Sequence, residues 1–353
     1  MGCEVGNLKL GAPAGGTPAA TTSHRTPGRP IGGRPVAEVA VTAPLPGPAL
    51  DLLRARHEVR VHSGPTMLEA EEVARWAEGA DALITLLANP VTSAVMDRSP
   101  GLRVIANCAA GFDNIDYREA ERRGIWVTNT PDVLTETTAD LTWALILAVT
   151  RRIIEADAFL RAGSFKGWQL DLMVGAGLQG RTLGIIGFGR IGRAVARRAP
   201  AFGMRVMATP SSSPTEEFEN VIIGDVETLV SSSDVLSLHC PLNDHTRGML
   251  DEASLRRMRP GAFLINTARG PVIDEAALVR VLEDGHLGGV GLDVFAQEPE
   301  VHPGLLGRED AVLLPHIGSA TREARSEMAE LAARNVLAVL TGDDPPSIVV
   351  RGR

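Results

Sequence analysis

Residues 183–194 read LGIIGFGRIGRA and are the most informative segment for the fold. An apolar run leads directly into Gly187, Gly189 and Gly192, which have the spacing GxGxxG, and a helical pattern follows them. In a strand–turn–helix unit, the first glycine permits the tight turn, the second lets backbone N–H groups approach a pyrophosphate, and the third lets helix and strand pack closely. The positive end of the helix then faces the phosphates. This context favours a dinucleotide site, and the alternative is a merely structural glycine turn.

The whole-chain composition bounds the classes of function. A length of 353 residues allows two domains with sizeable cores, and a formal net charge of −8 argues against a nucleic-acid partner. The three cysteines lie far apart without metal-ligand spacing, so we predict no metal site and a reducing compartment. The most hydrophobic stretch, Leu141–Val149, is too short to span a bilayer, and the N-terminus lacks the apolar core of a secretory signal. We therefore expect a cytoplasmic protein without a membrane partner.

The first part of the chain changes character near residue 35. Residues 1–34 are rich in Gly, Pro, Ala and Thr without a hydrophobic period, which predicts a disordered extension. Strands and helices then alternate, which predicts a parallel sheet covered on both faces. The expected strands are 36–41, 58–61, 82–86, 104–108 and 126–128, and helices are expected at 49–56 and 68–78.

A second alternating series begins at Leu183 and completes an α/β fold of two doubly wound parallel-sheet domains. Glu136–Ala162, between the two series, is interpreted as one long helical region with an apolar face, and Glu323–Leu340 as the last helix. Six strands are expected in the second series: Leu183–Ile186, Arg205–Ala208, Val235–His239, Ala262–Asn266, Gly289–Val294 and Val312–Leu314.

Three further motifs follow strands of this second series. They are NTARG at residues 266–270, GLDV at 291–294 with Glu298–Pro299 beyond it, and PHIGSAT at 315–321. In a doubly wound sheet, ligands bind outside the carboxyl ends of the strands. We therefore expect the side chains that these motifs carry to converge on one crevice, namely those of Arg269, Asp293, Glu298 and His316.

The ordered set of motifs resembles the D-isomer-specific 2-hydroxyacid dehydrogenase family over about residues 36–350. Within that family, TPDVLT at 130–135 and NCAAGFDNID at 107–116 look most like glyoxylate/hydroxypyruvate reductases. The resemblance implies a Rossmann-type cofactor domain, residues 133–319, inserted in a flavodoxin-like substrate domain formed by 35–132 and 320–353. Pro131 and Ser319 are the expected hinges.

The same resemblance implies a homodimer. The helical region from Glu136 onward resembles the family's dimer-forming arm, and its alternative is an ordinary interdomain core helix. Trp168 resembles the tryptophan that, in glyoxylate/hydroxypyruvate reductases, reaches the active site of the partner subunit. Simple burial at the dimer contact is the alternative for Trp168.

Reduction of a 2-oxo acid needs an acid for the carbonyl oxygen, and His316 is the candidate. A neighbouring carboxylate favours the protonated ring, and Glu298 is placed by its motif to supply it and to fix the ring's orientation. In the reverse direction the same histidine is the general base. The other histidines are interpreted as hydrogen-bonded structural residues: His24, His57, His62, His239, His245, His286 and His302.

The substrate itself needs an anchor and walls. Arg269 is the candidate anchor, because its fixed fork can hold a carboxylate bidentately, and a surface salt bridge is the alternative. Ala110 and Gly111 would expose backbone N–H groups to the substrate carboxylate, as the family does, although a plain tight turn explains them nearly as well. Leu86–Leu87 resembles a second wall of the pocket, so Leu87 joins the candidate substrate-binding residues.

Asp293 resembles the family residue that hydrogen-bonds the nicotinamide carboxamide, with a turn or capping aspartate as the alternative. Cys240 lies near the expected cofactor, although a small buried apolar side chain explains it too. The full set of predicted cofactor-binding residues is Gly187, Gly189, Arg190, Ile191, Gly192, Ser211, Ser212, Cys240, Pro241, Thr267, Ala268, Asp293, His316 and Gly318.

The segment after the second strand of this domain departs from the usual NAD pattern. An NAD site normally places Asp or Glu there to bind the ribose 2′-OH. Here no acidic residue occurs between Gly192 and Glu216, and Ser211–Ser213 could donate hydrogen bonds to a 2′-phosphate. The arginine that NADP-preferring relatives carry is missing as well. We predict NADP preference or use of both NADP and NAD, with a solvated serine-rich loop as the alternative.

These inferences combine into an enzyme that reduces glyoxylate, hydroxypyruvate or a similar small 2-oxo acid to the D-2-hydroxy acid with NAD(P)H. Another member of the family, such as a phosphoglycerate or formate dehydrogenase, is one alternative. A non-catalytic dinucleotide-sensing scaffold, like the family's corepressors, is the other. The acidic charge favours the enzyme.

Overall fold

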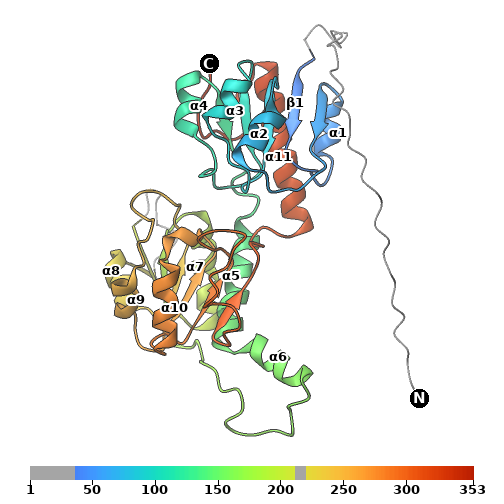
Figure 1. Ribbon diagram of the computed structural model, residues 1–353. Helices are drawn as coiled ribbons and strands as arrows, with labels where there is room; N and C mark the ends of the chain where they lie inside the picture. The colour runs from blue at the N-terminus through green and yellow to red at the C-terminus, as the bar shows by residue number, and fades with distance from the viewer. Residues whose placement is uncertain (1–35, 211–219) are drawn as a thin grey trace, which may run out of the picture. The chain divides into compact units, whose positions relative to one another are not determined.

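The computed structural model describes residues 36–210 and 220–353 (Figure 1). These residues form two parallel sheets. The first sheet has five strands in the order β2-β1-β3-β4-β5, and the second has seven in the order β12-β11-β10-β9-β6-β7-β8. Every neighbouring pair of strands is parallel. The structure therefore confirms the predicted class of two doubly wound α/β domains. The predicted extension 1–34 lies outside the described residues.

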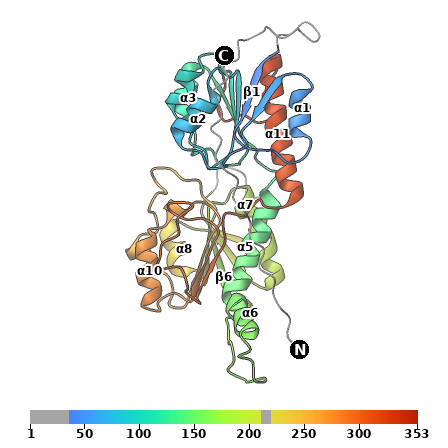
Figure 2. The same ribbon diagram turned by 45° about the vertical axis from the view of Figure 1, so that its right-hand side comes forward.

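The first sheet follows the 2-1-3-4-5 strand order of flavodoxin-like folds. Because helices cover both faces, its three central strands are almost continuously buried and apolar. One face packs on α1 and α11 and the other on α2, α3 and α4. Figure 2 shows α1 and α11 on one side of the sheet and α2 and α3 on the other. The bounds are β1 Glu38–Val41, α1 Ala49–Arg54, β2 Glu58–Val61, α2 Ala70–Ala77, β3 Ala82–Thr85, α3 Ser93–Arg98, β4 Val104–Asn107, α4 Tyr117–Arg123, β5 Trp126–Thr128 and α11 Arg322–Thr341.

The second sheet has the 3-2-1-4-5-6 order of dinucleotide-binding domains, extended by one strand. Helices α5 and α7 cover one face, and α8, α9 and α10 cover the other. The bounds are α5 Thr135–Thr150, α6 Ile153–Arg161, β6 Thr182–Ile186, α7 Arg190–Arg198, η1 Ala199–Phe202, β7 Arg205–Ala208, β8 Val221–Ile223, α8 Val226–Ser232, β9 Val235–Leu238, α9 Glu252–Arg257, β10 Phe263–Asn266, η2 Gly270–Val272, α10 Glu275–Glu283, β11 Gly289–Leu292 and β12 Ala311–Leu313.

Two predictions about this second domain were wrong. The described residues contain seven strands where six were expected, because β8 adds a short edge strand of three apolar residues, two of which are exposed. The single helix expected over Glu136–Ala162 is two helices. The chain breaks at Arg152, which adopts φ 53°, and the carbonyl of Thr150 accepts a hydrogen bond from the Ala176 N–H at 2.7 Å. A partner from outside the helix thus ends α5.

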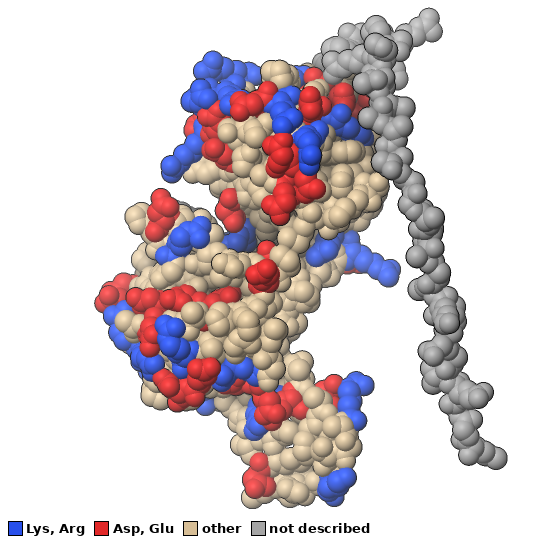
Figure 3. All heavy atoms as spheres, in the orientation of Figure 1, with Lys and Arg blue, Asp and Glu red and all other residues tan. Residues whose placement is uncertain are grey.

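Acidic and basic side chains are interspersed on the face shown in Figure 3. Among the described residues, no helix is long and apolar enough to cross a membrane. The part of the chain that the structure describes also contains no group of three or more His, Cys, Asp or Glu side chains arranged to hold a metal ion.

Candidate active site

The glycine turn between β6 and α7 is tightly packed on one side and open on the other. Gly187 has φ 97°, and a Cβ atom there would collide with the backbone of Cys240. A Cβ atom on Gly192 would collide with the carbonyl oxygen of Gly187. Gly189 is the N-cap of α7, and no atom lies within 4 Å of the position of a Cβ there. This open space in front of the α7 N–H groups fits the pyrophosphate of a dinucleotide.

Thr209, at the end of β7, supports the same turn. Its hydroxyl accepts a hydrogen bond from the Gly187 N–H at 3.0 Å. This contact was not foreseen, although a hydroxyl residue at the position where NAD sites carry an acid is visible in the sequence. Arg190 begins α7 and forms an ion pair with Asp132. Ser211 and Ser212 lie outside the described residues.

Four further predicted cofactor residues follow β9 and β10, beside the turn. Burial raises the pKa of the Cys240 thiol to about 11, so this group is a neutral, poorly reactive side chain. The carbonyl of Pro241 accepts from the Thr246 hydroxyl at 2.7 Å. The hydroxyls of Thr267 and Thr142 lie 3.0 Å apart, which ties the end of β10 to α5. Ile191, in the first turn of α7, is half-buried, as is Ala268 after β10.

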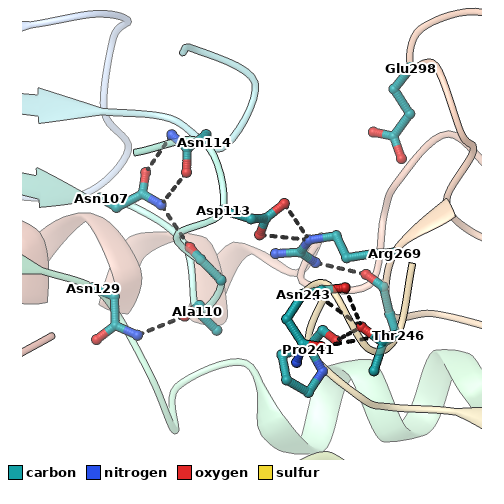
Figure 4. A network of polar contacts seen from close by, with 12 residues as sticks. Asn107, Ala110, Asp113, Asn114, Asn129, Pro241, Asn243, Thr246, Arg269 and Glu298 are labelled. Atoms are coloured by element: carbon teal, nitrogen blue, oxygen red, sulfur yellow. Dashed lines mark hydrogen bonds and ion pairs between the residues drawn. The ribbon is translucent and has the colours of Figure 1, made fainter. Parts of the chain in front are cut away.

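Arg269 projects from the end of β10 toward the loop that follows β4 (Figure 4). Its Nε donates to the carboxylate of Asp113 at 3.0 and 3.2 Å, and its Nη1 donates to the Ala268 carbonyl at 2.7 Å. A Cβ atom on Gly111 would collide with Nη2, and one on Gly270 would collide with the backbone of Phe295. Glycine is therefore required at position 270, whereas a side chain at position 111 would displace the guanidinium.

Three asparagines order the Ala110–Asn114 loop that Arg269 meets. Asn107 Nδ2 donates to the Gly111 carbonyl at 2.7 Å, and Asn129 Nδ2 donates to the Ala110 carbonyl at 2.6 Å (Figure 4). Asn114 Nδ2 donates to the Leu86 carbonyl at 3.1 Å, so the Leu86–Leu87 segment lies beside the loop. The sequence analysis did not identify a role for these asparagines. The only feature that could have pointed to them is that three asparagines occur close together in this part of the sequence.

His316 and Glu298 form a pair after β12 and β11. Nδ1 of His316 lies 2.8 Å from Oε2 of Glu298, whose Oε1 accepts from the Phe295 N–H at 3.1 Å. Although burial alone would raise the pKa of Glu298, its hydrogen bond and charge interaction with His316 outweigh that effect and lower it. Glu298 is therefore ionised and fixed by two bonds. Because Nδ1 faces the carboxylate, Nε2 is the ring nitrogen that can exchange a proton with a reactant.

Asp293 fixes the backbone around His316. Its carboxylate accepts from the N–H groups of Ile317 at 2.7 Å and Gly318 at 2.8 Å, and its carbonyl accepts from the His316 N–H at 2.9 Å. His316 itself has φ 52°, a costly conformation for a residue other than glycine. Asp293 is only 1% exposed, and this burial raises the pKa of its carboxyl group. The geometry is that of a turn aspartate, the alternative that the sequence left open.

Trp168 is placed differently from the other predicted residues. Its side chain is 80% exposed and lies in the segment after α6, which projects from the second domain (Figure 1). No side chain of α6 is buried.

Comparison with known proteins identifies the family of this chain. Residues 143–318 match the NAD binding domain of the D-isomer specific 2-hydroxyacid dehydrogenases. The glyoxylate reductase of Thermococcus litoralis is 44% identical over 318 residues, which cover 88% of this chain and 96% of that protein.

Two solved structures have the same fold over nearly their whole length. The TT0316 protein from Thermus thermophilus is 48% identical with a TM-score of 0.83, over 89% of this chain and 100% of that one. The NADPH-dependent glyoxylate/hydroxypyruvate reductase of Sinorhizobium meliloti, solved with NADP and malonate, is 31% identical with a TM-score of 0.78, over 90% of this chain and 99% of that one. The chain belongs to the D-isomer specific 2-hydroxyacid dehydrogenase family of NAD(P)-dependent oxidoreductases.

Proposed function

We propose that the protein reduces glyoxylate, hydroxypyruvate or a similar small 2-oxo acid with NAD(P)H to the 2-hydroxy acid, in the D-form where the product is chiral. The observation that carries the proposal is the His316–Glu298 pair, a proton donor held by an ionised carboxylate. The names of the relatives from Thermococcus litoralis and Sinorhizobium meliloti support this substrate class.

The proposed roles divide the reaction among the chain's own groups. A bound reduced nicotinamide supplies the hydride. His316 gives a proton from Nε2 to the carbonyl oxygen, and Glu298 orients the ring and stabilises its charged form. Arg269 binds the substrate carboxylate, together with backbone N–H groups at Ala110 and Gly111. Leu87 would form an apolar wall near the small substituent.

The proposed cofactor site comprises the glycine turn, the α7 N-terminus and the ends of β9 and β10. Besides fixing the His316 backbone, Asp293 is proposed to accept from the nicotinamide carboxamide. We propose that NADPH is used at least as well as NADH, since no carboxylate at residues 209–213 repels a 2′-phosphate. Pro210→Asp should shift the ratio of kcat/KM toward NADH through a ribose partner and charge repulsion. A parent that strongly prefers NADH would contradict this proposal.

The direct test is steady-state turnover of a panel of 2-oxo acids with each reduced cofactor. We expect glyoxylate or hydroxypyruvate to give the highest kcat/KM, and chiral analysis to show the D-product from hydroxypyruvate. Faster turnover of 3-phosphohydroxypyruvate would favour a phosphoglycerate dehydrogenase. Cofactor binding without turnover of any 2-oxo acid would favour a sensing scaffold.

We further propose a substrate domain formed by 35–132 and 320–353, a cofactor domain formed by 133–319, and a homodimer. The packing of α11 on the first sheet supports the division. Exposed apolar side chains on α6 and the following segment support the dimer: Ile153, Ile154, Leu160, Phe165, Trp168, Leu170 and Val174. Trp168 would lie at the dimer contact or reach the partner's active site. A monomeric mass by light scattering at micromolar concentration would contradict the dimer.

A further inference from the structure

Asp113 joins the loop after β4 to the arginine after β10. Both oxygens of its carboxylate lie within hydrogen-bond distance of Arg269 Nε, at 3.0 and 3.2 Å. Among the described residues, Asp113 has no other side-chain partner. The Arg269 side chain is 19% exposed and that of Asp113 is 33% exposed. The mostly buried guanidinium of Arg269 is thus paired with the carboxylate of Asp113. The proposed reaction does not itself require this carboxylate.

Two of the three guanidinium nitrogens of Arg269 donate hydrogen bonds within the protein, and the third is available to a ligand. Nε is held by Asp113, and Nη1 donates to the Ala268 carbonyl at 2.7 Å. Nη2 lies against Gly111, and no acceptor among the described residues takes its N–H groups. Because a guanidinium is planar and rigid, fixing Nε and Nη1 fixes the direction of Nη2.

Both ends of this ion pair rest on ordered backbone. On the Asp113 side, Asn107 Nδ2 bonds the Gly111 carbonyl and the Asn114 side chain, at 2.7 and 3.0 Å (Figure 4). On the Arg269 side, Asn266 Nδ2 donates to the Arg269 carbonyl at 2.9 Å. Neither partner therefore has to be ordered at the moment a substrate binds.

We propose that Asp113 is a positioning residue that turns Arg269 so that Nη2 receives the substrate carboxylate. The inference rests on the proposed function and deepens it. The carboxylate of Asp113 also places a negative charge beside Arg269, and this charge disfavours a second anionic group on the substrate. The site is therefore built for 2-oxo acids with one carboxylate and an uncharged substituent.

The test compares Asp113→Asn with a matched control, Asp116→Asn. Asp116 is the N-cap of α4 and accepts from the Glu119 N–H at 3.1 Å, a role that asparagine also fills. Both variants remove one negative charge from the same segment, but only the first removes a contact with Arg269. At a constant, saturating concentration of NADPH, Asp113→Asn should raise KM for glyoxylate about three- to tenfold with little change in kcat. Asp116→Asn should change neither.

Two further measurements separate positioning from a general structural role. The ratio of kcat/KM for oxaloacetate to that for glyoxylate should rise in Asp113→Asn and stay constant in Asp116→Asn. In an Arg269→Lys background, Asp113→Asn should change KM less than about twofold, because lysine has no planar fork for Asp113 to orient. If the asparagine variant does not fold, Asp113→Ser serves in its place.

The outcomes are distinguishable. An active parent in which Asp113→Asn behaves like Asp116→Asn overturns the inference and leaves the proposed function intact. An equal effect of Asp113→Asn with and without Arg269 also overturns it. A parent that reduces no 2-oxo acid overturns the proposed function, and the inference with it.

Discussion

His239 and His316 both follow strands of the second sheet, at its carboxyl edge, yet their surroundings differ. His239 Nε2 lies 2.8 Å from the hydroxyl of Ser237, and burial lowers the pKa of this histidine to about 3. His316 instead faces the ionised carboxylate of Glu298. A hydroxyl satisfies a neutral ring, whereas a carboxylate stabilises a charged one. The partner, and not the residue type or its place at a strand end, separates a structural histidine from a candidate acid.

The largest effect is expected when the candidate acid is removed. His316→Ala should lower kcat for 2-oxo acid reduction by roughly 10²–10⁴-fold, the usual contribution of a general acid. The affinity for NADPH, measured by its fluorescence on binding, should remain close to that of the parent. Turnover within a few-fold of the parent would remove His316 from the mechanism and erase the contrast with His239.

The next largest effect is expected at the anchor beside the pair. Arg269→Lys should lower kcat/KM by roughly 10- to 100-fold, about one or two charge-assisted hydrogen bonds, because an ammonium cannot reproduce the fixed fork. Arg259→Lys is a control on the same domain, since Arg259 Nη1 pairs with Asp234 at 3.1 Å, away from the strand-end motifs. Unchanged kinetic constants for Arg269→Lys would place that residue outside the site.

Glu298→Gln tests what the carboxylate adds to His316. Glutamine can still bond the ring but carries no charge, so kcat should fall, with a smaller loss than in His316→Ala. A kcat equal to that of the parent would show that the charge of Glu298 adds nothing and that the side chain only orients the ring.

The same variant has a predictable effect on stability. Because the folded-state pKa of Glu298 is lowered, its ionised form stabilises the fold above the unfolded-state pKa. The parent should therefore melt at a higher temperature than Glu298→Gln at neutral pH. This difference should disappear as the pH falls through the folded-state pKa, and a difference that grows in acid would contradict the assignment.

The smallest effect is expected at the other histidine. His239→Gln keeps a polar group near Ser237 and removes no charge, since the ring of His239 is neutral throughout the working pH range. The pH–rate profile should match that of the parent and kcat should stay within a few-fold. A shifted profile would mean that His239 titrates and would break the contrast.

Much of the candidate site could be proposed from the sequence because strand ends are local features. Periodic apolar runs placed the strands, and the motifs after β10, β11 and β12 put Arg269, Glu298 and His316 at one edge. Contacts that depend on side-chain direction were not predictable in this way. Arg269 meets Asp113 across 156 positions of sequence, and Asp293 bonds the backbone of the His316 loop.

The two parallel sheets, their strand-end motifs and the close-packed glycine turn could be predicted, because each depends on residues that are neighbours along the chain. Tertiary structure alone decided where α5 ends, which asparagines order the Ala110–Asn114 loop, and how Arg269 is turned. The break at Arg152 occurs where Ala176, returning from the segment beyond α6, donates its N–H to the carbonyl of Thr150, the last residue of α5. These features depend on hydrogen bonds between segments that are far apart in the sequence. A local pattern of hydrophobic and polar residues does not determine whether two such segments come within hydrogen-bond distance.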